Sequence, residues 1–176
     1  MYPFGRLALE MARNWRRNPL AVGEVHVTHL RVWPWDIDMM MELDNGRILS
    51  LMDLGRHGFF IRSGILKALK TKGWYGTVAG SAVRYRHRIT LGQKLELRTR
   101  VIGWDARFVY FDQAFWRGQE CCAHVVLRTA ITTGKGIVPT GEIAEVLGYD
   151  PVSPSLPDWV AAWADAETQR SWPPAY

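Results

Sequence analysis

Two aspartates stand shortly before a helix start in the segment RVWPWDIDMMMELDNGRIL, residues 31–49. Asp36 and Asp38 are separated by one residue, and Asn45-Gly46 marks a turn or a helix start soon afterwards. A carboxylate can act as a general base on water or attack a carbonyl directly. The first backbone N–H groups of a helix lack partners within the helix and suit a developing oxyanion. The spacing therefore places two carboxylates a few residues before free helix amides, an arrangement that suits chemistry on a carbonyl group.

These side chains also have structural explanations. Asp36 or Asp38 could instead cap a helix or brace the loop, and Asp44 is expected to be an N-cap rather than a catalyst. Asn45 is expected either to cap the helix or to touch a substrate. The methionines at positions 39–41 could line a flexible pocket, although filling the core is the favoured role.

Charged residues further along the chain offer other candidate sites. Asp53 is a rival carboxylate on the predicted helix, but its spacing to Arg56 and His57 favours an intrahelical pair. Every second residue of one predicted strand is basic: Arg84, Arg86 and Arg88. Arginine binds phosphate with a planar fork of donors, so these side chains are candidates for a phosphate-bearing ligand. A solvated outer face of the sheet is the alternative explanation.

The sequence argues against several classes of protein. No apolar run is long enough to span a bilayer, and no signal-peptide pattern is present. The net charge of +5 comes without a nucleic-acid-binding motif, so no nucleic-acid partner is expected. No metal-ligand spacing, glycine-rich phosphate loop or GxSxG motif occurs, and we expect no metal or cofactor. Cys121 and Cys122 would face opposite sides of a strand, which argues against a disulfide and for a cytoplasmic location.

Hydrophobic periodicity predicts the elements that would position these residues. After a first strand at 23–33, apolar residues recur every three or four positions from Asn45 to about Leu69 and cover most of the helix, which should therefore lie inside the protein. A close neighbour is expected at its three glycines, Gly55, Gly58 and Gly64. Period two then predicts four strands, at 75–89, 94–104, 107–117 and 120–133. Short turns between them favour a four-stranded antiparallel meander, with the helix across a curved sheet in an α+β fold.

Four short motifs follow one another along the chain. They are PWD at 34–36, an Asn-containing helix start, RYR at 84–86 and GWD at 103–105. In this order the chain resembles hotdog-fold acyl-CoA thioesterases of the 4-hydroxybenzoyl-CoA thioesterase type, and within them the thioesterase-superfamily member 6-like group. Asp36 and Asp38 match the family's Asp-x-Asp, and Leu43, Asn45 and Leu49 match positions of its helix start. Glu42, Asp44 and Ile48 depart from that pattern, where the family commonly has His, Asn and Tyr.

The resemblance, which covers about Val25 to Gly148, implies a fold, an activity and partners. The fold would be the hotdog fold, with a long central helix wrapped by a curved antiparallel sheet. The activity would be hydrolysis of an acyl-CoA thioester, with Asp36 and Asn45 as catalytic residues. Substrate-binding residues would be Leu43, Asp44, Arg84, Arg86 and Arg88. Because sites in this family lie between subunits, a homodimer or homotetramer is implied.

Two other functions stay open. The departures from the family pattern leave room for a non-catalytic hotdog module that binds an acyl-CoA or lipid, and a hotdog dehydratase fits the loop less well.

The flanks of the predicted hotdog domain, residues 23–148, are expected to be helical. Residues 1–22 form an N-terminal extension in which Leu7, Met11 and Trp15 stand beside arginines. This helix could touch a membrane peripherally, although packing on its own domain is favoured. Residues 149–176 are expected to form a proline-broken tail with a short helix from Asp158 to about Arg170.

Overall fold

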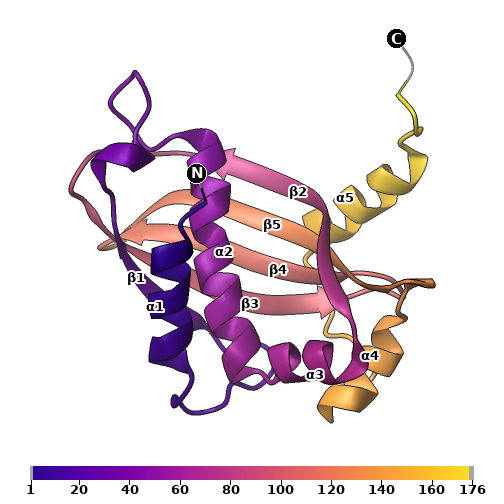
Figure 1. The fold of residues 1–176 in the computed structure, drawn as a ribbon. Coiled ribbons are helices and arrows are strands. Elements are labelled where there is room, and N and C mark those ends of the chain that lie inside the picture. The colour runs from indigo at the N-terminus through magenta and orange to yellow at the C-terminus, as the bar shows by residue number, and fades with distance from the viewer. Residues whose placement is uncertain (1, 175–176) are drawn as a thin grey trace.

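The computed structural model describes residues 2–174, which form one antiparallel sheet with helices on both faces (Figure 1). The strands are β1 (His26–Arg31), β2 (Tyr75–Tyr85), β3 (Lys94–Trp104), β4 (Val109–Arg117), β5 (Glu120–Thr133) and the short β6 (Gly136–Ile137). The helices are α1 (Phe4–Asn14), α2 (Asn45–Arg62), α3 (Ile65–Lys72), α4 (Thr140–Leu147) and α5 (Asp158–Gln169), with a 3-10 turn at Pro34–Asp36. α2 crosses one face of the curved sheet and α5 lies on the opposite face. The predicted α+β class and the helix from Asp158 are confirmed.

The order of the strands differs from the predicted meander. The sheet runs β1-β3-β4-β5-β2, so β2 pairs with β5 and not with β3. The prediction was wrong because β2 ends at Tyr85, four residues before the expected end at Ile89. Residues 86–93 instead run toward the opposite edge of the sheet, where Ile89 O accepts a hydrogen bond from Leu43 N (2.7 Å). Eight extended residues reach up to about 26 Å, which is enough to pass the two intervening strands.

The predicted helix from Asn45 to about Leu69 is in fact two helices. α2 ends at Arg62, and α3 begins at Ile65 after Gly64. Gly64 has a φ of 79°, in the left-handed region where a side chain would be strained. This glycine therefore permits the change of direction, and it is not a packing contact.

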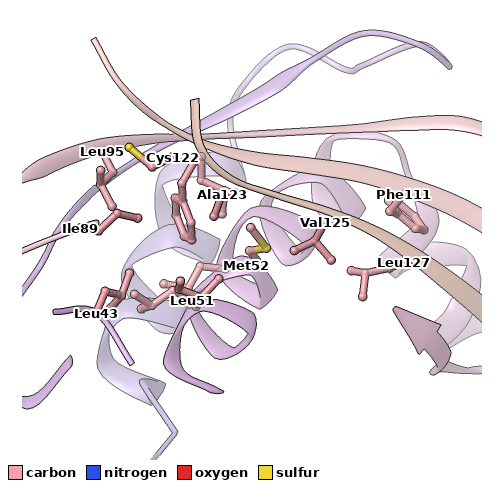
Figure 2. Close-up of a cluster of buried hydrophobic side chains, with 14 of the residues drawn as sticks. Leu43, Leu51, Met52, Ile89, Leu95, Phe111, Cys122, Ala123, Val125 and Leu127 are labelled. Carbon is pink, nitrogen blue, oxygen red and sulfur yellow. The ribbon is translucent and has the colours of Figure 1, made fainter. Parts of the chain in front are cut away.

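The main core lies between α2 and the sheet. Figure 2 shows side chains of α2 meeting side chains of the strands, among them Leu51, Met52, Phe111, Val125 and Leu127. The helix is buried around much of its circumference, as the sequence predicted.

Two glycines of α2 set how closely the helix approaches the sheet. A Cβ at Gly55 would lie 2.5 Å from Thr99 Oγ1, and one at Gly58 would lie 2.3 Å from His26 Nε2. Real Cβ atoms do not approach so closely, so only glycine allows this packing in a close-packed interior. The predicted close neighbours of Gly55 and Gly58 are thus β3 and β1.

α1 packs on α2 and β1 through buried polar side chains. Glu10 is 6% exposed, and its Oε1 accepts hydrogen bonds from Asn14 Nδ2 (2.8 Å) and Thr28 Oγ1 (2.6 Å). The same oxygen lies 3.3 Å from His26 Nε2. Buried polar groups of this kind are stable only when they are paired, and this cluster helps to attach the N-terminal helix to the sheet.

The predicted apolar stripe of α1 is only partly used in this packing. Leu7 packs against the main core, whereas Trp15 is 69% exposed. The helix therefore packs on its own domain, as favoured, and contact with a membrane stays a prediction. Among the described residues, no helix is long and apolar enough to cross a bilayer.

Glu10 is expected to make the packing of α1 sensitive to acid. Burial raises the pKa of Glu10, but hydrogen bonds from His26, Thr28 and Asn14 outweigh burial, so the pKa lies below its usual value of 4.5. A carboxylate whose pKa falls on folding stabilises the folded state above its unfolded pKa, and this contribution is lost as the pH drops through the folded value. We expect Glu10→Gln to flatten the loss of unfolding free energy below about pH 4.5, measured by urea denaturation across the acid range.

The control for this measurement is Glu145→Gln, which removes an exposed carboxylate from α4. This variant should keep the acid dependence of the wild type. If Glu10→Gln and the wild type lose stability in parallel below about pH 4.5, the cluster does not contribute the expected proton linkage.

Candidate functional site

Asp36 is completely buried and is held by two arginines. Its Oδ2 accepts hydrogen bonds from Arg6 Nη2 of α1 (2.8 Å) and from the backbone N–H of Trp33 (2.9 Å). Its Oδ1 accepts a hydrogen bond from Arg47 Nε of α2 (2.8 Å). These bonds join α1, the loop after β1 and the first turn of α2 at one carboxylate. Asp36 thus braces the loop, and its predicted role in chemistry is left untested by these contacts.

Asp38 is held less completely than Asp36. Its Oδ1 accepts hydrogen bonds from the backbone N–H groups of Met40 (2.8 Å) and Glu42 (3.3 Å), which close a tight turn. Among residues 2–174, no hydrogen-bond donor contacts its Oδ2. The side chain is half-buried and lines an open groove, so one carboxylate oxygen is accessible to a ligand.

The N-terminus of α2 lies on the same groove. Asp44 is the N-cap, as predicted, because its Oδ1 accepts a hydrogen bond from Arg47 N (2.8 Å). Within the described chain, the backbone N–H groups of Asn45 and Gly46 have no acceptor. The Asn45 side chain is exposed and is not the cap. Two helix amides are therefore available to a ligand oxygen, as the sequence predicted for this helix start.

The groove has a volume of about 420 Å³, within the range of about 300–1,000 Å³ usual for small-molecule sites. Aromatic and apolar side chains meet polar ones around it: Tyr2, Trp35, Ile37, Asp38, Asp44, Gly46, Arg47 and Ser50. A Cβ at Gly46 would meet only Asp44 Oδ1, at 3.3 Å, so the first turn of α2 leaves the groove open. The arrangement can accept an acyl group whose carbonyl points at the helix.

The predicted row of arginines on one strand face does not form. β2 ends at Tyr85, so Arg84 alone of the three belongs to the strand. Arg86 and Arg88 follow in the crossing segment, where side chains no longer alternate between two faces. Arg88 donates a hydrogen bond to the Glu42 carboxylate (2.9 Å) and so braces the turn that carries Asp38.

Leu43 and Arg84 lie away from the groove. Leu43 is buried in the main core, close to Ile89 (Figure 2). Val83 packs on that same core, and neighbouring side chains of a strand point to opposite faces, so Arg84 faces the outer side of the sheet. Of the predicted substrate-binding residues, Asp44 lines the groove.

The rival carboxylate, Asp53, forms an intrahelical ion pair with Arg56, as predicted. Arg56 also donates a hydrogen bond to Gln113 Oε1 (2.6 Å), and Gln113 Nε2 donates to Met52 O (2.9 Å) and Thr99 Oγ1 (2.8 Å). Burial lowers the pKa of Arg56 to about 10, so the guanidinium stays charged at neutral pH. This network ties α2 to the sheet and gives Asp53 a structural role.

Sequence reasoning missed Arg6, Arg47 and Tyr2. Arg6 stands 30 residues before Asp36 and meets it only through the packing of α1. Arg47 could have been found, because a basic residue in the first turn of a helix is opposed by the helix dipole and needs a specific partner. Tyr2 precedes α1 and carries no local signal of its place in the groove.

A long helix across one curved antiparallel sheet is the hotdog architecture, and here a loop with two carboxylates precedes the helix. The model of the thioesterase-like superfamily matches residues 32–164, and the chain therefore belongs to that superfamily. The matched range contains the loop, α2 and the sheet from β2 onwards, whereas α1 lies outside it.

Curated relatives with similar sequences include two proteins called THEM6. The protein from Xenopus laevis is 30% identical over 132 residues, which covers 75% of this chain and 63% of the relative. The protein from Danio rerio is 35% identical over 89 residues, which covers 51% of this chain and 44% of the relative. The chain thus spans less than two thirds of either relative.

Solved structures with the same fold include two whose titles name them as thioesterases. The probable thioesterase YbaW from Escherichia coli superposes with a TM-score of 0.65 at 16% identity and covers 69% of this chain and 96% of its own. The 1,4-dihydroxy-2-naphthoyl-CoA thioesterase from Synechocystis has a TM-score of 0.60 at 9% identity and covers 70% and 95%. At these identities the likeness establishes the hotdog fold.

Proposed function

We propose that the chain hydrolyses the thioester of a fatty or aromatic acyl-CoA in the groove at the N-terminus of α2. The observation that carries this proposal is that the Asp38 carboxylate and the first turn of α2 line one groove, and that the Asn45 and Gly46 amides of this turn have no acceptor among residues 2–174. Thioester hydrolysis needs an activated water or a carboxylate nucleophile, donors for the oxyanion and a cleft for the acyl group. The thioesterase titles of structures with this fold agree with the reaction class.

In this proposal the Asp-x-Asp pair divides two roles between its members. Asp36 positions the loop, because both of its oxygens already accept hydrogen bonds from Arg6, Arg47 and the Trp33 amide. Asp38 takes a proton from water as that water attacks the thioester carbonyl. The C–S bond then breaks, the proton passes from Asp38 to the CoA thiolate, and the free acid and CoA are released. The competing assignment is Asp36 itself as base or nucleophile. It would require Asp36 to break its ion pairs with Arg6 and Arg47.

The oxyanion in this proposal is bound by the N–H groups of Asn45 and Gly46. Preorganised amides aimed at a developing negative charge supply a large share of catalysis in acyl transfer. The partial positive charge of the helix N-terminus acts in the same direction. Asn45 therefore contributes through its backbone, and its side chain is free to contact the substrate.

The proposal is tested by measuring release of free CoA from a panel of acyl-CoAs that includes short aliphatic, long aliphatic and aromatic acyl groups. Binding of the same compounds is measured in parallel by calorimetry. Turnover of at least one class supports hydrolysis. Binding without turnover for every compound would contradict hydrolysis and favour the second candidate function, a hotdog module that binds acyl-CoA or lipid. The observation that favours this candidate is the burial of Asp36, the first residue of the Asp-x-Asp motif, in two ion pairs.

We further propose that two copies of the chain associate through β2. This strand pairs with β5 on one side, and Tyr75 and Val78 are 69% and 47% exposed. A long open edge strand invites pairing, and a two-fold contact between copies would satisfy it. In such a dimer each groove would lie near the second copy.

We expect Val78→Lys to convert a dimer into a monomer, because a charge on an edge strand blocks pairing. Light scattering after size-exclusion chromatography measures the mass. The control is His29→Lys, at an exposed position of β1 on the other edge of the sheet. A monomeric wild type, or a variant that stays dimeric, would rule out association through β2.

A further inference from the structure

A small apolar cavity lies at the C-terminal end of α2. It has a volume of about 50 Å³, and its lining includes Phe59, Val101, Trp104 and Ala144, from α2, β3 and α4. Figure 1 shows α3 and α4 near this end of α2, whereas the loop that precedes α2 lies at the other end. α2 has 18 residues, so at about 1.5 Å per residue the cavity is about 25 Å from the helix amides of the first groove. The cavity is therefore separate from that groove.

Ser63 brings an unpartnered hydroxyl to this cavity. It is the C-cap of α2, its N–H donates to Phe59 O (2.9 Å), and its carbonyl accepts a hydrogen bond from the Tyr149 hydroxyl (3.2 Å). Its own hydroxyl is buried and has no hydrogen-bond partner among residues 2–174. A water there would find few further partners, because the Thr140 and Tyr149 hydroxyls already donate to backbone carbonyls. A buried hydroxyl without a partner costs free energy, so Ser63 indicates a ligand with a polar atom.

An open groove, which we call the Arg62 groove, adjoins the cavity and shares Ser63 and Tyr149 with it. It has a volume of about 610 Å³. Arg62 lines this groove and is held in place, because its Nε donates to Asn18 O (2.9 Å) and its Nη1 lies 3.2 Å from His26 Nδ1. In the described part of the chain its Nη2 has no acceptor. A fixed guanidinium therefore offers a free donor next to the Ser63 hydroxyl.

The charges around the Arg62 groove favour an anion. Burial lowers the pKa of Arg62, and repulsion from the nearby Arg17 lowers it further. Glu24 also lines the groove and acts in the opposite direction, but its Oε2 already accepts a hydrogen bond from Ala21 N (2.7 Å). A bound anion would relieve the repulsion between the two arginines.

We propose that this site binds a short-chain monocarboxylate of about four carbons, with the carboxylate between the Ser63 hydroxyl and the Arg62 guanidinium and the tail in the cavity. One water occupies about 10–15 Å³ on this scale, so 50 Å³ holds a tail of about three carbons. A hydroxyl and a guanidinium both donate to a carboxylate. The site does not depend on the proposed hydrolysis, because it shares no residue with the groove at the N-terminus of α2.

The test is titration of the full chain with sodium butyrate, followed in backbone ¹H–¹⁵N NMR spectra. We expect saturable shifts of the Ser63, Gly64 and Ala144 amides, and no shift of the Asn45 and Gly46 amides in the other groove. Acetate and octanoate should each bind at least about tenfold more weakly. Acetate has fewer carbons to bury, and the octanoate tail exceeds the volume of the cavity.

Two variants test the polar contacts. Ser63→Ala and Arg62→Gln should each weaken butyrate by about tenfold, because each removes a donor to the carboxylate. Ser63→Ala should fold as well as the wild type, since it removes a buried group without a partner. The control Lys67→Gln removes an exposed cation of α3 that lines neither the cavity nor the Arg62 groove, and should leave the affinity unchanged.

Three results would overturn the proposal. The first is the absence of shifts at the cavity amides with butyrate. The second is an affinity that Ser63→Ala and Arg62→Gln leave unchanged while their spectra show both variants folded. The third is binding of 1-butanol as tightly as butyrate, because the site would then not recognise the carboxylate.

Discussion

Replacement of Asp38 by asparagine is expected to lower the turnover of an acyl-CoA by about 10²–10⁴-fold, the usual contribution of a positioned general base. Asparagine has nearly the shape of aspartate and can still accept the hydrogen bonds from the Met40 and Glu42 amides that hold the turn. It cannot take a proton from water. The substrate should therefore still bind, and the loss should appear in kcat rather than in KM.

The matched control for this prediction is Asp44→Asn in the same groove. Asn caps a helix about as well as Asp, so this variant removes a carboxylate from the groove while it keeps the start of α2 intact. We expect it to retain turnover within a few-fold of the wild type. An unchanged rate in Asp38→Asn, with loss of turnover in a folded Asp36→Asn variant, would move the chemistry to Asp36.

A second measurement separates the two mechanisms open to Asp38. During hydrolysis in ¹⁸O-labelled water, a nucleophilic carboxylate forms an anhydride with the acyl group as CoA leaves. When water opens this anhydride at the Asp38 carbonyl, the label enters Asp38 and an Asp38 oxygen leaves in the released acid. A general base delivers the label only to the released acid. Mass spectrometry of the peptide that contains Asp38 is expected to show no label.

Replacement of Arg6 by glutamine is expected to lower the unfolding free energy by about 2–3 kcal/mol, because it leaves the buried Asp36 carboxylate with one arginine instead of two. Asp36 has no solvent exposure, and Arg6 Nη2 is one of its two side-chain partners. The figure lies below the usual loss of about 3–5 kcal/mol for a broken buried ion pair, because Arg6 keeps 18% of its side chain in solvent and Arg47 still neutralises the charge. Urea denaturation measures the loss.

The control for the Arg6–Asp36 ion pair is Arg13→Gln, which removes an exposed arginine from the last turn of the same helix. It should change the unfolding free energy by less than about 0.5 kcal/mol. The Arg6→Gln/Asp36→Asn double variant should lose less than the sum of the two single losses, because each partner is costly only when the other remains charged. Strict additivity would show that Arg6 and Asp36 do not interact.

Much of the site's local structure could be predicted from the sequence. The Asp-x-Asp loop, the helix start at Asn45 and the N-cap at Asp44 follow from residue types and short spacings, which act over one turn of chain. The four later strands were found from period two because alternation records which side of a sheet is buried. The intrahelical pair of Asp53 and Arg56 followed from a spacing of three.

The strand order and the partners of Asp36 were not available from the same patterns. Periodicity states which face of a strand is buried but not which strand lies beside it. The pattern therefore predicts a hairpin between residues 75–89 and 94–104, whereas these two strands are not neighbours in the sheet. Arg84 lies on the face of the sheet that α5 covers, away from the groove, because it follows the inward-facing Val83 in β2.

By itself, the sequence determined which segments form helices and strands. It also determined that the carboxylates and the helix amides lie near one another along the chain. The tertiary structure alone decided which carboxylate is accessible, because Arg6 reaches Asp36 from a helix 30 residues away. The physical reason is that burial and ion pairing depend on distances in space, and these arise only when α1, the loop and α2 pack together.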